Sequence, residues 1–187
     1  MSLPRWGGLA GVLAGVMYAL TGVVDRQGPL YPRFFSSPSD YLVQYTFLMA
    51  LAGTLVALVG LHILQRGSYG WTGTAGFAVA LVGHLLFLWV VVEQIIQGTS
   101  VGPGTQQLGS YAVPIGLMLL ALATLLAGVL PRWCVVALLV GGVLAYLSKF
   151  MIWSPLLGVV LGAVWASVGY ALLSGRYAPA RRPTRVS

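Results

Sequence analysis

The feature that most constrains the fold of this chain is an apolar stretch from Trp71 to Gln97. It is about 27 residues long, whereas a helix needs roughly 20 apolar residues to cross a bilayer. Five further apolar runs are long enough or nearly long enough to span: Trp6–Val24, Tyr41–Leu64, Tyr111–Leu130, Trp133–Trp153 and Pro155–Ser174. The last two are divided at Pro155, because proline suits the first turn of a helix and disrupts its interior. The pattern predicts an all-α integral membrane protein, folded as a six-transmembrane-helix bundle.

The composition excludes a soluble globular domain. Hydrophobic residues make up 58% of the chain and charged residues only 7%, so there are too few polar side chains to cover a water-facing exterior. The formal net charge of +7 comes from basic residues near the ends of the apolar runs, which is typical of topology signals and gives no reason to expect a nucleic-acid partner. The single cysteine, Cys134, excludes an internal disulfide. We expect one transmembrane domain over residues 1–175 and a basic cytoplasmic tail over residues 176–187.

The distribution of basic residues predicts the orientation. With the N-terminus in the cytoplasm, seven of them are cytoplasmic and three are outside. The seven are Arg5, Arg66, Arg132, Arg176, Arg181, Arg182 and Arg185, and the three are Arg26, Arg33 and Lys149. Because cytoplasmic loops carry an excess of Lys and Arg, both termini are expected to be cytoplasmic in a multi-pass protein of the cell membrane.

Small residues recur at four-residue steps along several of the predicted helices. In lipid, such residues allow two helix backbones to approach closely. The ridges are Gly7, Gly11, Gly15 and Ala19 on the first run, and Gly158, Gly162 and Ala166 on the sixth. A ridge on the third run leads to His84, and one on the fifth run leads to Lys149, so both side chains are expected to face protein. The same faces could also support a homo- or hetero-oligomer.

The scarce ionisable side chains gather in the extracytoplasmic half of the predicted bundle. The candidate catalytic group is Glu93 as acid or base, with Lys149 or Tyr146 as its partner and Asp25 as a further carboxylate. The residues predicted to surround a bound molecule are polar or aromatic and lie in the same half or at the midplane: His84, Trp89, Gln97, Tyr18, Thr21, Gln44 and Tyr45.

These charged residues also have structural interpretations. Glu93 lies close enough to the boundary to reach headgroup water, and Lys149 could extend toward it along its own stem. A pair of the two would stabilise both charges without any catalysis. Asp25 could mark a helix end, and Ser39 or Asp40 could cap the second helix.

Among the polar residues of the predicted helices, His84 most needs an explanation, because the bilayer midplane offers no water to hydrogen-bond an imidazole. It could ligate haem or a metal ion, carry a proton, or donate a structural hydrogen bond. Bis-histidine haem needs a second histidine at the same depth, and His62 lies near the cytoplasmic end of its helix. A metal site needs several convergent ligands, which the midplane does not supply. We therefore expect no cofactor and no metal.

Three functions remain open on the sequence alone. The first is an outward-opening intramembrane pocket for a hydrophobic small molecule, a lipid or terpenoid, with acid–base isomerase or cyclase chemistry as its extension. The second is a small secondary transporter that uses His84 at the midplane. The third is a scaffold or accessory subunit of a membrane complex. The first is preferred, because the polar groups of one half lie above an apolar floor. Membrane lipid and a hydrophobic small molecule are the expected partners.

Overall fold

The computed structural model describes residues 2–24, 37–98, 103–148 and 155–175, and these segments are helical almost throughout. They form six α-helices: α1 (Leu3–Val24), α2 (Pro38–Gln65), α3 (Gly70–Gln97), α4 (Pro103–Ala127), α5 (Arg132–Leu147) and α6 (Pro155–Ser174). The predicted all-α class is confirmed, as is the helix start at Pro155. The predicted capping of the second helix is shifted, because α2 starts after Ser37, whose backbone N–H donates to Asp40 Oδ2 at 2.9 Å.

Five of these helices are long and apolar enough to cross a membrane. The exception is α5, which has 16 residues and is therefore about 24 Å long, shorter than the roughly 30 Å of a hydrocarbon core. Its predicted continuation to Trp153 lies outside the described residues. The chain is thus a multi-pass membrane protein by helix length and hydropathy.

The fourth helix begins eight residues earlier than predicted, at Pro103 instead of Tyr111. The stretch before Tyr111 is uncharged and rich in glycine, which is typical of a flexible loop, but residues 103–110 are helical. The physical reason is a contact with a helix that is distant in the sequence. Gly109 lies against α3, where a Cβ would be 3.3 Å from Gly83 O and from the Phe87 ring, so the added turns pack on a neighbouring helix.

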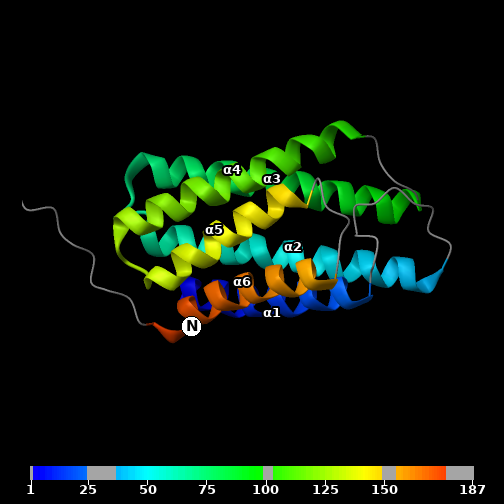
Figure 1. Cartoon of the computed structure of the whole chain (residues 1–187), viewed down its shortest axis with the longest axis horizontal. Helices are drawn as coiled ribbons and strands as arrows, with labels where there is room; N and C mark the ends of the chain where they lie inside the picture. The colour runs from blue at the N-terminus through cyan, green and yellow to red at the C-terminus, as the bar shows by residue number, and fades with distance from the viewer. Residues whose placement is uncertain (1, 25–36, 99–102, 149–154, 176–187) are drawn as a thin grey trace, which may run out of the picture.

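Consecutive helices pack side by side, and α6 closes the ring by packing on α1 (Figure 1). The most extensive interfaces join α1 to α6 and α2, and α3 to α4, whereas α2 meets α3 and α5 meets α6 over less surface. The beginning of α1 and the end of α6 lie at one end of the bundle, called here the N-terminal end (Figure 1). The opposite end is called the far end. That the N-terminal end is cytoplasmic stays a prediction.

The glycine ridges lie where helices approach most closely. A Cβ on Gly15 of α1 would be 2.4 Å from the carbonyl oxygen of Gly162 on α6, and one on Gly7 would be 2.8 Å from the Cα of Gly60 on α2. Real side chains do not tolerate such distances, so these contacts require glycine. The ridge of α1 is therefore divided between two neighbours within the same chain, and an oligomer through these faces stays a prediction.

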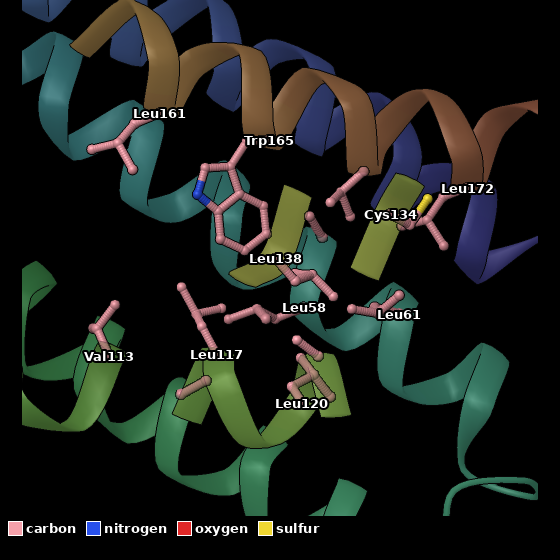
Figure 2. Close-up of a cluster of buried hydrophobic side chains, with 14 of the residues drawn as sticks. Leu58, Leu61, Val113, Leu117, Leu120, Cys134, Leu138, Leu161, Trp165 and Leu172 are labelled. Carbon is pink, nitrogen blue, oxygen red and sulfur yellow. The ribbon is translucent and has the colours of Figure 1, made fainter. Parts of the chain in front are cut away.

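The interior of the bundle is filled by large apolar side chains. Trp165 of α6 is the largest of them, and it points from α6 toward α2, α4 and α5 (Figure 2). Leucines from those three helices belong to the same buried cluster: Leu58, Leu61, Leu117, Leu120 and Leu138. This packing leaves the buried polar side chains as the exceptions that need an explanation.

Candidate functional site

One face of α2 lines the bundle interior along its whole length. Its members alternate at three- and four-residue spacing, which keeps them on one side of a helix. They are all buried: Gln44, Phe47, Leu51, Thr54, Leu58, Leu61 and Gln65. Polar residues therefore occur at the start, the middle and the end of this face. At 1.5 Å per residue, Thr54 is about 15 Å from Gln44 and about 16 Å from Gln65.

The register between α2 and α3 follows from one ring pair. His62 of α2 stacks on Phe77 of α3 with ring centroids 4.1 Å apart. Eight residues back along α2 and eight forward along α3 bring Thr54 level with Leu85, the neighbour of His84. Because His84 follows Phe77 by seven residues, or two helical turns, it also faces α2. Thr54 and His84 thus lie at one depth near the middle of the bundle.

The imidazole of His84 has a defined tautomer. Its exposed fraction is 2%, and its Nδ1 lies 2.7 Å from the carbonyl oxygen of Ala80. A carbonyl oxygen can only accept, so Nδ1 carries the hydrogen and the neutral ring presents Nε2 as an acceptor. Among the described residues Nε2 has no hydrogen-bond partner. Trp165 meets this ring edge to face, with centroids 6.0 Å apart.

Thr54 differs from the other buried threonines. Thr21 and Thr124 donate to the carbonyl oxygens four residues before them, at 2.8 Å and 2.7 Å. Thr54 is equally buried, yet its Oγ1 has no well-formed hydrogen bond within the described chain. The hydroxyl of Tyr18 lies beside it. We call Tyr18, Thr54, His84 and Trp165 the central polar layer.

A second group of buried polar side chains lies nearer the far end. The hydroxyl of Thr21 on α1 is 3.0 Å from that of Thr46 on α2. Eighteen residues before His62, Gln44 lies level with Ile95 of α3, the neighbour of Gln94. Gln44 and Gln94 are both buried, and the Oε1 of Gln94 has no hydrogen-bond partner in the described part of the chain. The interior is therefore polar at this end as well.

The structure divides the residues predicted to form the site. Tyr18, Thr21, Gln44 and His84 are in the interior. Tyr45, Trp89, Tyr146 and Gln97 lie on the outside of the bundle, and Trp89 is 62% exposed. Glu93 is half-buried and accepts a 3.0 Å hydrogen bond from Gln97 Nε2. Asp25 and Lys149 lie outside the described residues. The catalytic group centred on Glu93 stays a prediction.

Several interior polar residues were missed by sequence reasoning. They are the buried Thr54, Gln65 and Gln94 and the partly buried Thr46; the buried Trp165, which lies against His84, was missed as well. The signal for two of them was present, because Gln44, Thr54 and Gln65 share the three-and-four spacing with the leucines of α2. In the parts of the chain that the structure describes, no three His, Cys, Asp or Glu side chains come together.

At the N-terminal end, the turn between α2 and α3 is closed by aromatic contacts. The phenol of Tyr69 hydrogen-bonds to His62 Nδ1, and His62 stacks on Phe77. The Tyr69 ring lies directly over Gly73, where a Cβ would be 1.8 Å from Cδ2. Burial raises the pKa of Tyr69 to about 12, so the phenol keeps its proton at neutral pH and can donate to His62.

Replacing Gly73 with alanine should expel the Tyr69 ring from this turn. In water the phenol returns to an ordinary pKa near 10, so Tyr69 should ionise about two pH units lower than in the unchanged chain. Ultraviolet titration at the tyrosinate band measures this pKa. The Tyr69→Phe variant shows how much of the absorbance change comes from Tyr69. Gly67→Ala is the control, because a Cβ there meets nothing within 4 Å. Equal Tyr69 titration in Gly73→Ala and Gly67→Ala would contradict the packing described.

No protein-family model, curated protein or solved structure matches this chain.

Proposed function

We propose that this chain binds a small, mostly apolar molecule carrying a hydroxyl group, a terpenoid or lipid alcohol, at the central polar layer. The observation that carries the proposal is the pair Thr54 and His84, buried at one depth. Thr54 Oγ1 has no well-formed hydrogen bond in the described chain, and the His84 ring bonds to the backbone through Nδ1, which leaves Nε2 as an acceptor. A buried polar atom left unpaired costs about 1–3 kcal/mol, so a partner at this depth is expected. A ligand hydroxyl can donate to His84 Nε2 and accept from Thr54.

The surroundings favour an apolar ligand body. Trp165 lies against His84, and the residues before and after Thr54 on the buried face of α2 are leucines. Entry from the far end is supported by the buried polar side chains there, Thr21, Gln44 and Gln94, which would solvate a hydroxyl on its way inward. The proposal keeps the outward-opening pocket expected from the sequence as a prediction, with His84 and Thr54 in place of Glu93 as the principal contacts.

The test uses the protein in phosphatidylcholine nanodiscs and radiolabelled farnesol as the probe. His84→Leu and Thr54→Val should each weaken farnesol binding about tenfold, the equivalent of one lost hydrogen bond of about 1.4 kcal/mol. Thr124→Val is the matched control, because the Thr124 hydroxyl is already bonded to Leu120 O. Farnesyl methyl ether, which lacks the donor, should bind the unchanged protein as weakly as farnesol binds His84→Leu. Equal binding of farnesol by all variants would overturn the proposal.

An isomerase or cyclase reaction extends this proposal. Such chemistry needs a proton donor or acceptor at the ligand, and His84 Nε2 is an acceptor within the layer itself. The sequence prediction assigned this role to Glu93, which lies nine residues further along α3, about 13 Å toward the far end. Product analysis of farnesol incubated with Glu93→Gln and His84→Gln distinguishes the two assignments.

Transport is the second candidate function. It is favoured by the buried face of α2, which carries polar residues at both ends and in the middle, and so offers polar groups in both halves of the bundle. The sequence alone indicated a polar path in the outer half only. Uptake of a substrate into proteoliposomes, lost in His84→Leu, would favour transport over binding alone.

A further inference from the structure

The end of α2 holds a polar side chain that takes no part in the proposed binding of a hydroxyl-bearing ligand at the central polar layer. Gln65 is fully buried, and both atoms of its carboxamide, Nε2 and Oε1, lack hydrogen-bond partners in the described chain. A buried side chain that is unsatisfied at both its donor and its acceptor is rare in a folded protein. It points to a partner that occupies this position when the protein is in its membrane.

The chemistry of the carboxamide restricts that partner. Its donor and acceptor lie side by side in one plane, so one water molecule cannot make a straight hydrogen bond to both. A group that itself presents an acceptor beside a donor can bond to both atoms of the amide at once, through two nearly straight hydrogen bonds. The group must also be neutral, because an ion at a fully buried, uncharged amide would lose far more hydration than two hydrogen bonds restore.

The position of Gln65 indicates where the partner comes from. Gln65 is the last residue of α2 and is followed by the exposed Arg66, while the exposed Trp71 lies in the first turn of α3. Arginine and tryptophan at helix ends are typical of the membrane–water boundary, where lipid headgroups lie. The α2–α3 interface is also less extensive than those of α1 with α2 and α3 with α4, so acyl chains lying along it would displace fewer contacts than at either of those.

We infer that Gln65 is the centre of a second binding site, for a neutral lipid whose head carries a free hydroxyl beside an ester carbonyl, as in a diacylglycerol. The lipid carbonyl accepts from Gln65 Nε2 and its hydroxyl donates to Oε1. The site lies about 16 Å from Thr54 at 1.5 Å per residue, so it is separate from the central polar layer.

The experiment uses the full chain in dioleoylphosphatidylcholine nanodiscs, with bound lipid counted by native mass spectrometry. The probe is 1,2-dioleoylglycerol, and its matched analogue is 1,2-dioleoyl-3-acetylglycerol, which keeps the acceptors and lacks the donor. The unchanged protein should bind the first about tenfold more tightly than the second. Gln65→Leu should lose that preference, and Thr124→Val should keep it. Free glycerol is added as a competitor, to test whether a soluble molecule with the same hydroxyl chemistry can occupy the site. It is expected to displace no 1,2-dioleoylglycerol.

A measurement of melting temperature shows whether weak binding by Gln65→Leu comes from misfolding and not from the loss of the amide. Gln65→Leu removes an unsatisfied amide and should melt at or above the temperature of the unchanged protein when no diacylglycerol is present. A stable Gln65→Leu protein that binds 1,2-dioleoylglycerol as well as the unchanged chain would overturn the inference. Binding lost in His84→Leu but kept in Gln65→Leu would also overturn it, because the lipid would then occupy the central polar layer.

Discussion

Replacing Gly162 with valine should have one of the two largest effects on folding among the single substitutions considered for this chain. A Cβ at Gly162 would lie 2.5 Å from the carbonyl oxygen of Gly15 and 3.1 Å from the backbone nitrogen of Ala19. Backbone atoms of a packed helix cannot move aside as a side chain can, so α6 must separate from α1. We expect the free energy of unfolding to fall by at least about 3 kcal/mol. For a chain of this size the melting temperature should drop by on the order of 10 °C.

Gly104→Val provides the control for this substitution. Gly104 lies in the first turn of α4, and a Cβ there meets no atom within 4 Å. Both variants add the same side chain to a helix, so their intrinsic helix propensities change alike. Circular dichroism during heating in detergent micelles measures both. Similar melting temperatures for Gly162→Val and Gly104→Val would show that the α1–α6 contact is not as close as described.

Truncating Trp165 to alanine should cost about 3–5 kcal/mol of unfolding free energy, the range for a large aromatic side chain lost from a packed core. The indole is 2% exposed and belongs to the same buried cluster as leucines of α2, α4 and α5 (Figure 2). Its removal leaves a cavity that the helices can close only in part, and it removes the ring that lies against His84. Farnesol binding at the central polar layer should weaken as well.

The matched control is Trp89→Ala. Trp89 is 62% exposed on the outside of α3, so its loss removes contacts with lipid or detergent and few with protein. A change of roughly 0.5 kcal/mol or less is expected. Unfolding in increasing sodium dodecyl sulfate, followed by circular dichroism, compares the two variants directly. An effect of Trp89→Ala as large as that of Trp165→Ala would show that Trp89 also lines the interior, as the sequence prediction held.

Much of the architecture could be predicted from the order of residues. Apolar runs identified the helices because a bilayer accepts few other structures. The boundary at Pro155 and the helix end before Gly98 followed from local chemistry, since proline begins a helix and a glycine with φ of 65° ends one. The start of α4 at Pro103 could not be predicted in this way. It depends on Gly109 meeting α3, a contact with a segment more than 20 residues earlier in the chain.

The candidate site was predictable only in part. Ionisable side chains are scarce in this chain, and their scarcity identified His84 as one that must face protein. The structure gives His84 an exposed fraction of 2%. Scarcity also drew attention to Glu93, which the structure places half-buried beside the exposed Gln97. An uncharged residue such as Thr54 gives only the weaker signal of its three-and-four spacing with the leucines of α2, because threonine in a membrane helix usually bonds to its own backbone. Only the absence of that bond, within the described chain, separates Thr54 from Thr124.

The sequence by itself determined that this chain enters a membrane, how many helices it has and where most of them begin and end, because those properties depend on hydropathy and on residues close in the chain. The tertiary structure alone decided which side chains meet. Thr54 and His84 are 30 positions apart, and their common depth depends on the α2–α3 register that the His62–Phe77 stack reveals. The register between two helices is set by the packing of glycines and rings that are far apart in the sequence. No local sequence pattern encodes that packing. For that reason the bundle could be predicted, whereas the meeting of Thr54 and His84 in the central polar layer could not.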